Sequence, residues 1–202
     1  MPRPARFRAC KARTLRLPTL RTDDGKVMLA AAQSFKNKRN IENPELYAVF
    51  PFRLVALDKP LARLGIEALN RRKDKGALGW RQDDVFMAYL GLADQAREYT
   101  VKRARSKHAG SRFPAFWGPN YDWVPDQDHG SVLLKTVQAM LMQTDGRQIY
   151  LLPAWPKDWN ADFKLHAPSN TTVSGKVERG KLVQLKVEPE SRRKDVKMPT
   201  ER

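Results

Sequence analysis

The chain has 202 residues, and 38 lysines and arginines against 22 aspartates and glutamates give it a formal charge of +16. A hydrophobic fraction of 41% with five tryptophans is typical of a folded globular protein and excludes a disordered chain. No stretch of eighteen apolar residues occurs, which excludes a membrane-spanning helix. The single cysteine, Cys10, excludes an internal disulfide and a cysteine-based metal site.

The first 22 residues form a basic leader. They contain seven arginines and lysines and no acidic residue, so that the rest of the chain carries a charge of +9. Because the leader lacks the apolar segment of a secretory signal, and its prolines are atypical of a transit peptide, we predict that residues 1–22 are poorly ordered. Beyond the leader, basic residues are mixed with carboxylates, as on a solvated surface. A nucleic-acid-binding function, suggested by a pI near 10.2, therefore stays an alternative.

Residues 23–146 show the pattern of paired amphipathic helices. Asn43-Pro44-Glu45 combines an N-cap residue, a proline and an acid, which predicts a helix that Pro51 kinks or ends. Asp58-Lys59-Pro60 predicts the start of a second helix, which a basic run and Gly76 end. The spacing of apolar residues predicts three more helices, after Trp80-Arg81-Gln82-Asp83-Asp84, over about 94–107 and over 131–143.

The pattern of the chain becomes extended after Asp145-Gly146. Residues 148–155 are apolar, and alternating apolar residues on both sides of Arg179-Gly180 predict a β-hairpin. We therefore predict a β module over residues 147–190. The remaining residues, 191–202, are predicted to be a charged tail that frays.

The stretch Gly110–Gly130 is predicted to be an irregular loop, because it holds three prolines, three glycines and five aromatic residues. A loop of this length in a compact domain is usually functional. Aromatic faces beside amides and carboxylates suit a sugar, whose C–H faces stack on rings while its hydroxyls bond to polar groups. The candidate residues of the loop are Trp117, Asn120, Tyr121, Trp123, Asp126, Asp128 and His129. The alternative is that the rings fill the core and that Asp128 caps the following helix.

Trp80 is a further candidate for the same sugar-binding site. With Asp83 and Asp84 it offers a ring and two carboxylates, the alternative being a core tryptophan before an acid-rich helix start. The three histidines are scattered, and the spacing of Asp126, Asp128 and Gly130 does not fit a calcium-binding EF-hand loop. No metal and no cofactor are therefore expected.

With these residues in view, the chain resembles the C-terminal part of glycoside hydrolase family 95, which includes α-L-fucosidases, and its uncharacterised relatives. The resemblance lies in Asp128-His129-Gly130, the helix end Met140-Leu141-Met142-Gln143, Thr144-Asp145-Gly146 and the run IYLLPAWPKDW over residues 149–159. It extends over roughly residues 35–187. The family's His-Arg-His run is replaced here by Ile41-Glu42-Asn43-Pro44-Glu45, so specificity for fucose does not follow.

The resemblance implies a fold and a catalytic residue. The family has an (α/α)6 barrel followed by a β-domain, so residues 23–146 are expected to be a partial barrel and the C-terminal module a small β-sandwich-like segment. Asp128 aligns with the family's catalytic base, which activates water in an inverting mechanism, and Asp126 is the fallback. The general acid, a glutamate, lies upstream in the family, in a missing N-terminal part of the same protein.

The sequence therefore yields one main hypothesis and two alternatives. The main hypothesis is a C-terminal fragment of an inverting glycoside hydrolase, in which Asp128 is catalytic and Trp80, Trp117, Asn120, Tyr121, Trp123 and His129 bind the carbohydrate substrate. The isolated chain is expected to lack turnover, because half of the carboxylate pair is missing. The alternatives are a non-catalytic carbohydrate-binding remnant and a basic nucleic-acid-binding protein. The resemblance also implies exported full-length relatives, while this chain leaves its own compartment undetermined.

Overall fold

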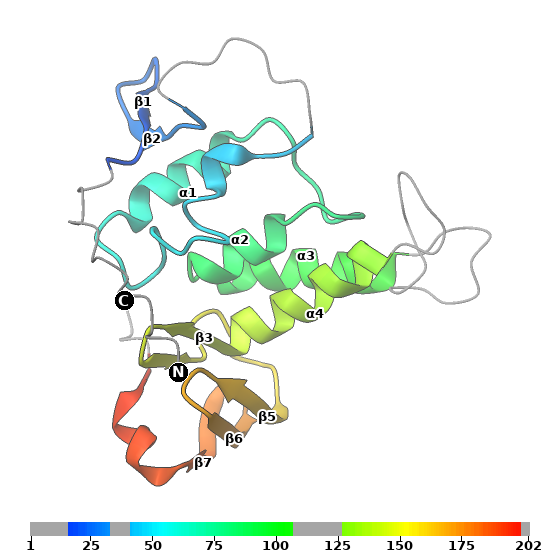
Figure 1. The fold of residues 1–202 in the computed structure, drawn as a ribbon. Helices are drawn as coiled ribbons and strands as arrows, with labels where there is room; N and C mark the ends of the chain where they lie inside the picture. Colours follow the sequence, from blue (N-terminus) through cyan, green and yellow to red (C-terminus); the bar gives the residue numbers. More distant parts are fainter. Residues whose placement is uncertain (1–15, 33–40, 107–126, 199–202) are drawn as a thin grey trace, which may run out of the picture.

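The computed structural model describes residues 16–32, 41–106 and 127–198. These residues form four α-helices, two 3₁₀-helices and eight short strands in three small sheets. Figure 1 shows the helices in one half of the molecule and the C-terminal strands in the other. Within the described part, no helix combines the length and apolar character needed to cross a bilayer.

The helical half contains one 3₁₀-helix and the four α-helices. They are η1 (Pro44–Leu46), α1 (Ala62–Arg71), α2 (Asp83–Tyr89), α3 (Ala93–Arg105) and α4 (Gln127–Leu141). Each contributes buried apolar side chains to one shared core, among them Leu46, Leu69, Met87, Ala96 and Met140. The predicted helix starts are close to the observed ones, except that the segment after η1 continues as turns instead of a helix.

The predicted partial (α/α)6 barrel is wrong. Its helices would form inner and outer rings, whereas α2, α3 and α4 pack on one another around a single core and α1 packs on a β-hairpin. Helix α4 runs straight into a strand, and the chain then forms two sheets. The described residues therefore form a small mixed fold of helices and sheets. Amphipathic spacing predicted the four α-helices but not the turns after η1, and it gives no information on how helices are arranged.

A short hairpin precedes the helices, which corrects the prediction that residues 1–22 are poorly ordered throughout. Strand β1 (Thr19–Arg21) pairs antiparallel with β2 (Val27–Leu29) across the turn at Gly25. Leu29 of β2 is buried against α1, which holds the hairpin to the core. Residues 1–15 of the predicted leader lie outside the described residues.

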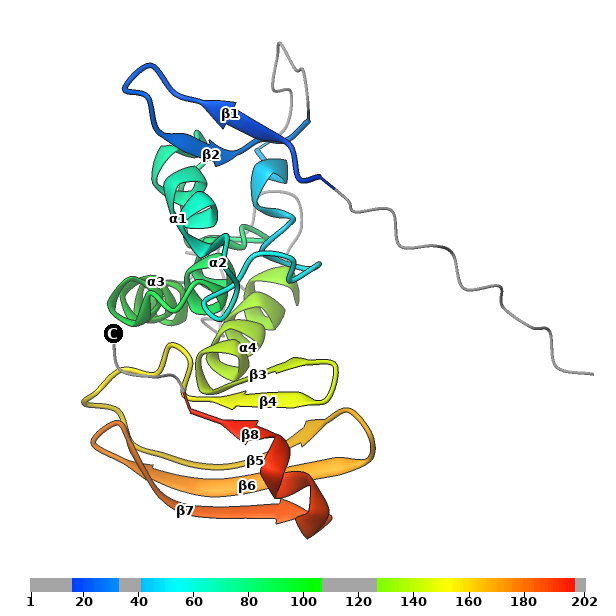
Figure 2. The ribbon, with the colours of Figure 1, turned by 90° about the vertical axis from the view of Figure 1, so that its left-hand side faces the viewer.

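The C-terminal half consists of two three-stranded sheets. One contains β3 (Met142–Asp145), β4 (Gln148–Leu151) and β8 (Val196–Lys197), and the other β5 (Ala161–Ala167), β6 (Thr171–Glu178) and β7 (Lys181–Glu188). Figure 2 shows the two sheets as successive layers below α4. Their facing side chains form a second core that includes Ile149, Leu151, Val173 and Val187. The predicted hairpin is confirmed as β6 and β7.

The predicted fraying tail is wrong for residues 191–198. Residues Glu190–Asp195 form the 3₁₀-helix η2, and β8 then adds to the sheet beside β4. Arg192 is buried, donates to the Thr171 hydroxyl at 2.9 Å and pairs with Asp195. A charged C-terminal run is typical of a fraying tail, but here the buried Arg192 anchors the segment to the sheet.

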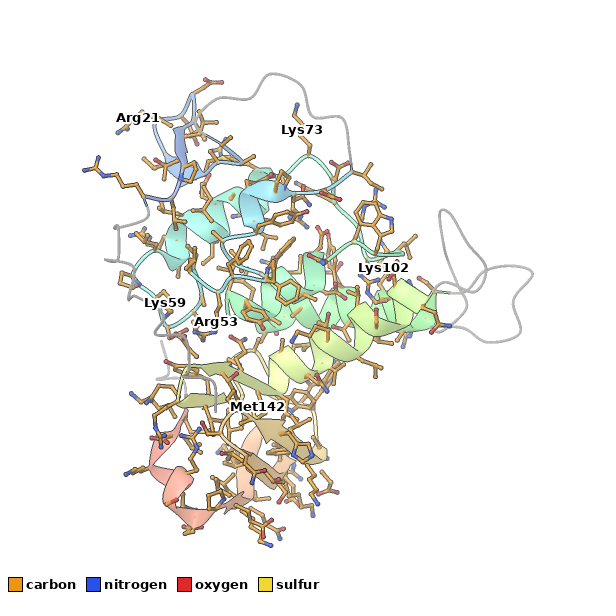
Figure 3. All side chains as sticks on the ribbon, viewed as in Figure 1. Arg21, Arg53, Lys59, Lys73, Lys102 and Met142 are labelled. Carbon is orange, nitrogen blue, oxygen red and sulfur yellow. The ribbon has the colours of Figure 1, made fainter. Side chains whose placement is uncertain are left out.

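A cluster of charged residues joins the two halves (Figure 3). Arg53 donates to Asp58 Oδ1 at 2.6 Å and to Asp145 Oδ2 at 3.1 Å, and Lys59 also pairs with Asp145. The Arg53 guanidinium lies 4.9 Å from the centre of the Tyr150 ring. Because Asp145 and Tyr150 belong to the β3–β4 hairpin, this cluster fixes the hairpin against the helical half.

Candidate functional site

A pocket of about 80 Å³ opens between the segment before η1 and the turn before α2. We call it the Trp80 pocket. Its wall combines aromatic rings with two acids, two amides and a guanidinium: Ile41, Glu42, Asn43, Tyr47, Trp80, Arg81, Gln82, Asp83 and Phe86. Trp80, Tyr47, Glu42 and Gln82 are half-buried, so their side chains reach the pocket surface while the backbone below them is packed.

Two polar groups of the pocket are not committed to the protein. Within the described part of the chain, the indole N–H of Trp80 and the side-chain amide of Gln82 have no hydrogen-bond partner. An indole N–H donates only, whereas an amide both donates and accepts. The pocket therefore offers a ligand an aromatic face together with three N–H donors and a carbonyl acceptor.

The opposite wall is fixed by hydrogen bonds within the segment around η1. The Tyr47 hydroxyl donates to Glu42 Oε2 at 2.7 Å, and Asn43 donates to the backbone carbonyl of Asp74 at 2.9 Å. Burial and the bond to the Glu42 carboxylate raise the pKa of Tyr47 to about 12. Tyr47 is therefore a neutral phenol at ordinary pH that donates its proton to the Glu42 carboxylate across the wall.

Asp83 and Asp84, considered for the same cavity, are both fully buried in ion pairs. Asp83 lines the pocket and pairs with Arg72, while Asp84 pairs with Arg103 at 2.8 Å. Burial raises the pKa of Asp83, and the charge of Arg72 opposes that shift only in part. The two acids at the start of α2 are thus partners of buried arginines, which agrees with the structural alternative for this motif.

The turn that carries Trp80 is held from below by α3. Arg103 Nη1 donates to the carbonyl of Gly79 at 2.7 Å, and its Nη2 donates to the carbonyl of Arg81 at 2.6 Å. These two carbonyls flank Trp80. The guanidinium is completely buried and also forms two bonds with the Asp84 carboxylate.

His129 links the same turn to α4. Its Nδ1 accepts from the backbone N–H of Gly79 at 3.2 Å, and its Nε2 lies 2.9 Å from the carbonyl of Arg103. These partners assign the neutral tautomer with the proton on Nε2. His129 is fully buried and both of its ring nitrogens are bonded to backbone groups, while its role in substrate binding stays a prediction.

Asp128, the predicted catalytic residue, is exposed in the first turn of α4. It is adjacent to His129, whose partner Gly79 is adjacent to Trp80. The structure thus brings Asp128 and Trp80, 48 positions apart in the sequence, to neighbouring turns of the fold. The other predicted residues lie outside the described part of the chain: Trp117, Asn120, Tyr121, Trp123 and Asp126.

Glu42, Tyr47 and Gln82 were missed by sequence reasoning. Glu42 lies in a segment noted only for its difference from the family, and Tyr47 was not singled out as a candidate. Their contribution depends on the approach of two segments about 40 residues apart, for which the sequence holds no local signal.

No model of a known protein family matches the chain, and no curated protein matches it. Within the described residues, no group of three or more histidine, cysteine, aspartate or glutamate side chains is placed to hold a metal ion. The case for a function therefore depends on the Trp80 pocket itself.

Proposed function

We propose that the protein binds carbohydrate in the Trp80 pocket. The proposal is carried by one observation: a half-buried tryptophan and the amide of Gln82, both uncommitted, share a pocket with Tyr47 and the Glu42 carboxylate. A sugar presents an apolar C–H face and a rim of hydroxyls that donate and accept. Apolar walls with a few convergent polar groups are the general form of a small-molecule site.

The size of the pocket suggests one sugar unit. A volume of about 80 Å³ corresponds to roughly six water molecules, since one water needs about 10–15 Å³ of such space. A single ring, stacked on Trp80 with one edge in the pocket, would displace about that number. A longer glycan would place one unit here and extend into solvent.

We further propose that this site belongs to a glycoside hydrolase, with Asp128 as the base. The observation that favours it is the bond between Gly79 and His129, which places the Asp128 turn beside the Trp80 turn. An exposed carboxylate near a bound sugar can polarise the attacking water, and inverting enzymes separate the acid and base by about 6.5–9.5 Å. On this proposal the general acid comes from a further part of the protein, and the 202-residue chain binds without turnover.

Titration calorimetry with neutral monosaccharides and their methyl glycosides tests the binding proposal. We expect saturable binding to the wild-type chain, lost in Trp80→Ala and weakened in Gln82→Ala. Phe52→Ala is the matched control, because Phe52 is an aromatic residue of the same half that is 67% exposed outside the pocket. The absence of binding to any sugar, or equal binding by Trp80→Ala, would reject the proposal.

The nucleic-acid alternative is tested with the same variants. It predicts binding of a short duplex DNA that weakens steeply with salt and is unaffected by Trp80→Ala. If the wild-type chain binds DNA but no sugar, carbohydrate binding is rejected in favour of that alternative. The hydrolase proposal predicts that Asp128→Asn, in any protein that supplies this chain with the general acid, abolishes turnover with sugar binding retained.

A further inference from the structure

We infer that Arg103 is a positioning residue for the Trp80 pocket, fixing the tryptophan ring from below. The inference rests on the proposed carbohydrate site and adds a residue that is itself outside the pocket lining. It starts from the pattern of bonds made by one buried guanidinium. Four of its hydrogen bonds have donor–acceptor distances of 2.6–3.1 Å, two to Asp84 and two to the carbonyls on either side of Trp80.

The bonds to Gly79 and Arg81 restrict the backbone on both sides of the tryptophan. The Gly79 carbonyl lies in the peptide plane directly before Trp80 and the Arg81 carbonyl in the second plane after it, so fixing both restricts the backbone that carries the Trp80 side chain. The N–H of Gly79 is also bonded, to His129, and His129 bonds in turn to the carbonyl of Arg103. The Trp80 turn thus has three backbone groups held by α3 and α4.

The geometry requires arginine in particular. A guanidinium presents several N–H groups in a planar fork, so it can bond to a carboxylate and two carbonyls at once. A lysine at this position would keep the positive charge beside Asp84, but one ammonium group cannot reach all of these acceptors. Arg103→Lys therefore distinguishes two effects: it retains part of the ion pair with Asp84 but loses the hydrogen bonds that position Trp80.

Holding the ring in advance matters for a weak ligand. Binding a sugar to a mobile ring requires that the ring be ordered at that moment, which reduces the affinity. We expect Arg103→Lys to weaken sugar binding about tenfold or more. We also expect acrylamide to quench the Trp80 fluorescence more strongly, with the Trp80 signal taken as the difference from Trp80→Phe.

Arg192→Lys is the matched control. Arg192 is also buried, pairs with Asp195 and donates to the carbonyl of Arg147 at 3.0 Å, but it lies in the β half of the molecule. We expect it to lower stability without changing sugar affinity or Trp80 quenching. Equal loss of affinity in both variants, or unchanged affinity and quenching in Arg103→Lys, would overturn the inference.

If Arg103→Lys does not fold, a second pair of variants tests the backbone restraint on the Trp80 turn that Arg103 and His129 share. His129→Asn retains an acceptor near the position of Nδ1, whereas His129→Gln retains only the group near Nε2. The inference predicts faster hydrogen exchange of the Gly79 amide and greater Trp80 quenching in His129→Gln than in His129→Asn; equal behaviour would overturn it. Both measurements need no ligand, so they still report the positioning role if the wild-type chain binds no sugar and the proposed function fails.

Discussion

Replacing Arg53 by methionine should destabilise the protein by about 2–3 kcal/mol, because Arg53 joins the helical half to the β3–β4 hairpin. It donates to Asp58 and Asp145, whose side chains are 20% and 38% exposed, so each charged hydrogen bond is worth about 1 kcal/mol after screening by solvent. The contact with the Tyr150 ring adds about 0.5–1 kcal/mol. Lys59 remains with Asp145 and limits the loss.

A second substitution at the same position tests how the backbone conformation of Arg53 affects the free energy of unfolding. Arg53 has φ of 48°, in the left-handed region that costs a non-glycine residue about 1–2 kcal/mol. Glycine adopts this φ freely, so Arg53→Gly should lose the same side-chain contacts and yet be about 1 kcal/mol more stable than Arg53→Met. Urea unfolding at pH 7, followed by circular dichroism, measures both free energies of unfolding. A loss below about 0.5 kcal/mol in Arg53→Met, or a less stable glycine variant, would refute this account.

Three further predictions concern titration and backbone conformation. Burial raises the pKa of Asp58, but the hydrogen bond to Arg53 and the charge of Arg53 together lower it by more, so this pKa lies below its ordinary value. The stability that the carboxylate contributes should therefore be full above about pH 4 and be lost as the pH falls. Urea midpoints measured from about pH 2 to 6 should show this loss in the wild-type chain and a smaller loss in Arg53→Met. Tyr47 should ionise at about pH 12 by ultraviolet absorbance. Glu42→Gln should lower that midpoint but leave it above 10, because burial is the larger cause. Gly180→Ala should cost about 2 kcal/mol or more, because φ is +70° and the added Cβ would meet backbone atoms at 2.5 Å.

The elements that the sequence predicted well are those whose signal is local. The hairpin of β6 and β7 follows from alternating apolar residues and the Arg179-Gly180 turn, and both turn residues have positive φ as expected. Helix α3 (Ala93–Arg105) matches the predicted span of about 94–107 because its apolar spacing and basic C-terminal turn are contained in the helix. Strands of two or three residues, such as β1 and β8, were missed because their pattern is too short to show a period.

The candidate site was predicted only in part, because its geometry depends on long-range pairs. Trp80 was identified from residue type and neighbouring acids, but the bond between Gly79 and His129 spans 50 positions, and that between Arg103 and Asp84 spans 19. No spacing rule predicts which arginine pairs with which acid. The partners of His129 were unpredictable for the same reason: it stands beside a candidate base in the sequence, whereas its ring is bonded to backbone groups of two other segments.

The two buried ion pairs at the pocket, Arg72–Asp83 and Arg103–Asp84, are better explained by the positions that they impose on neighbouring groups than by the stability that they add. A buried arginine–carboxylate pair often contributes little net stability, because removing both charges from water costs about as much as their attraction returns. Apolar residues of similar volume at Arg103 and Asp84 would pack the core, but would leave the carbonyls of Gly79 and Arg81 without donors. The ion pair is thus the arrangement that keeps a five-donor side chain buried and aimed at the Trp80 turn. A pocket for a solvated, hydroxyl-rich ligand gains most from such fixed groups, because water competes for every hydrogen bond the ligand forms.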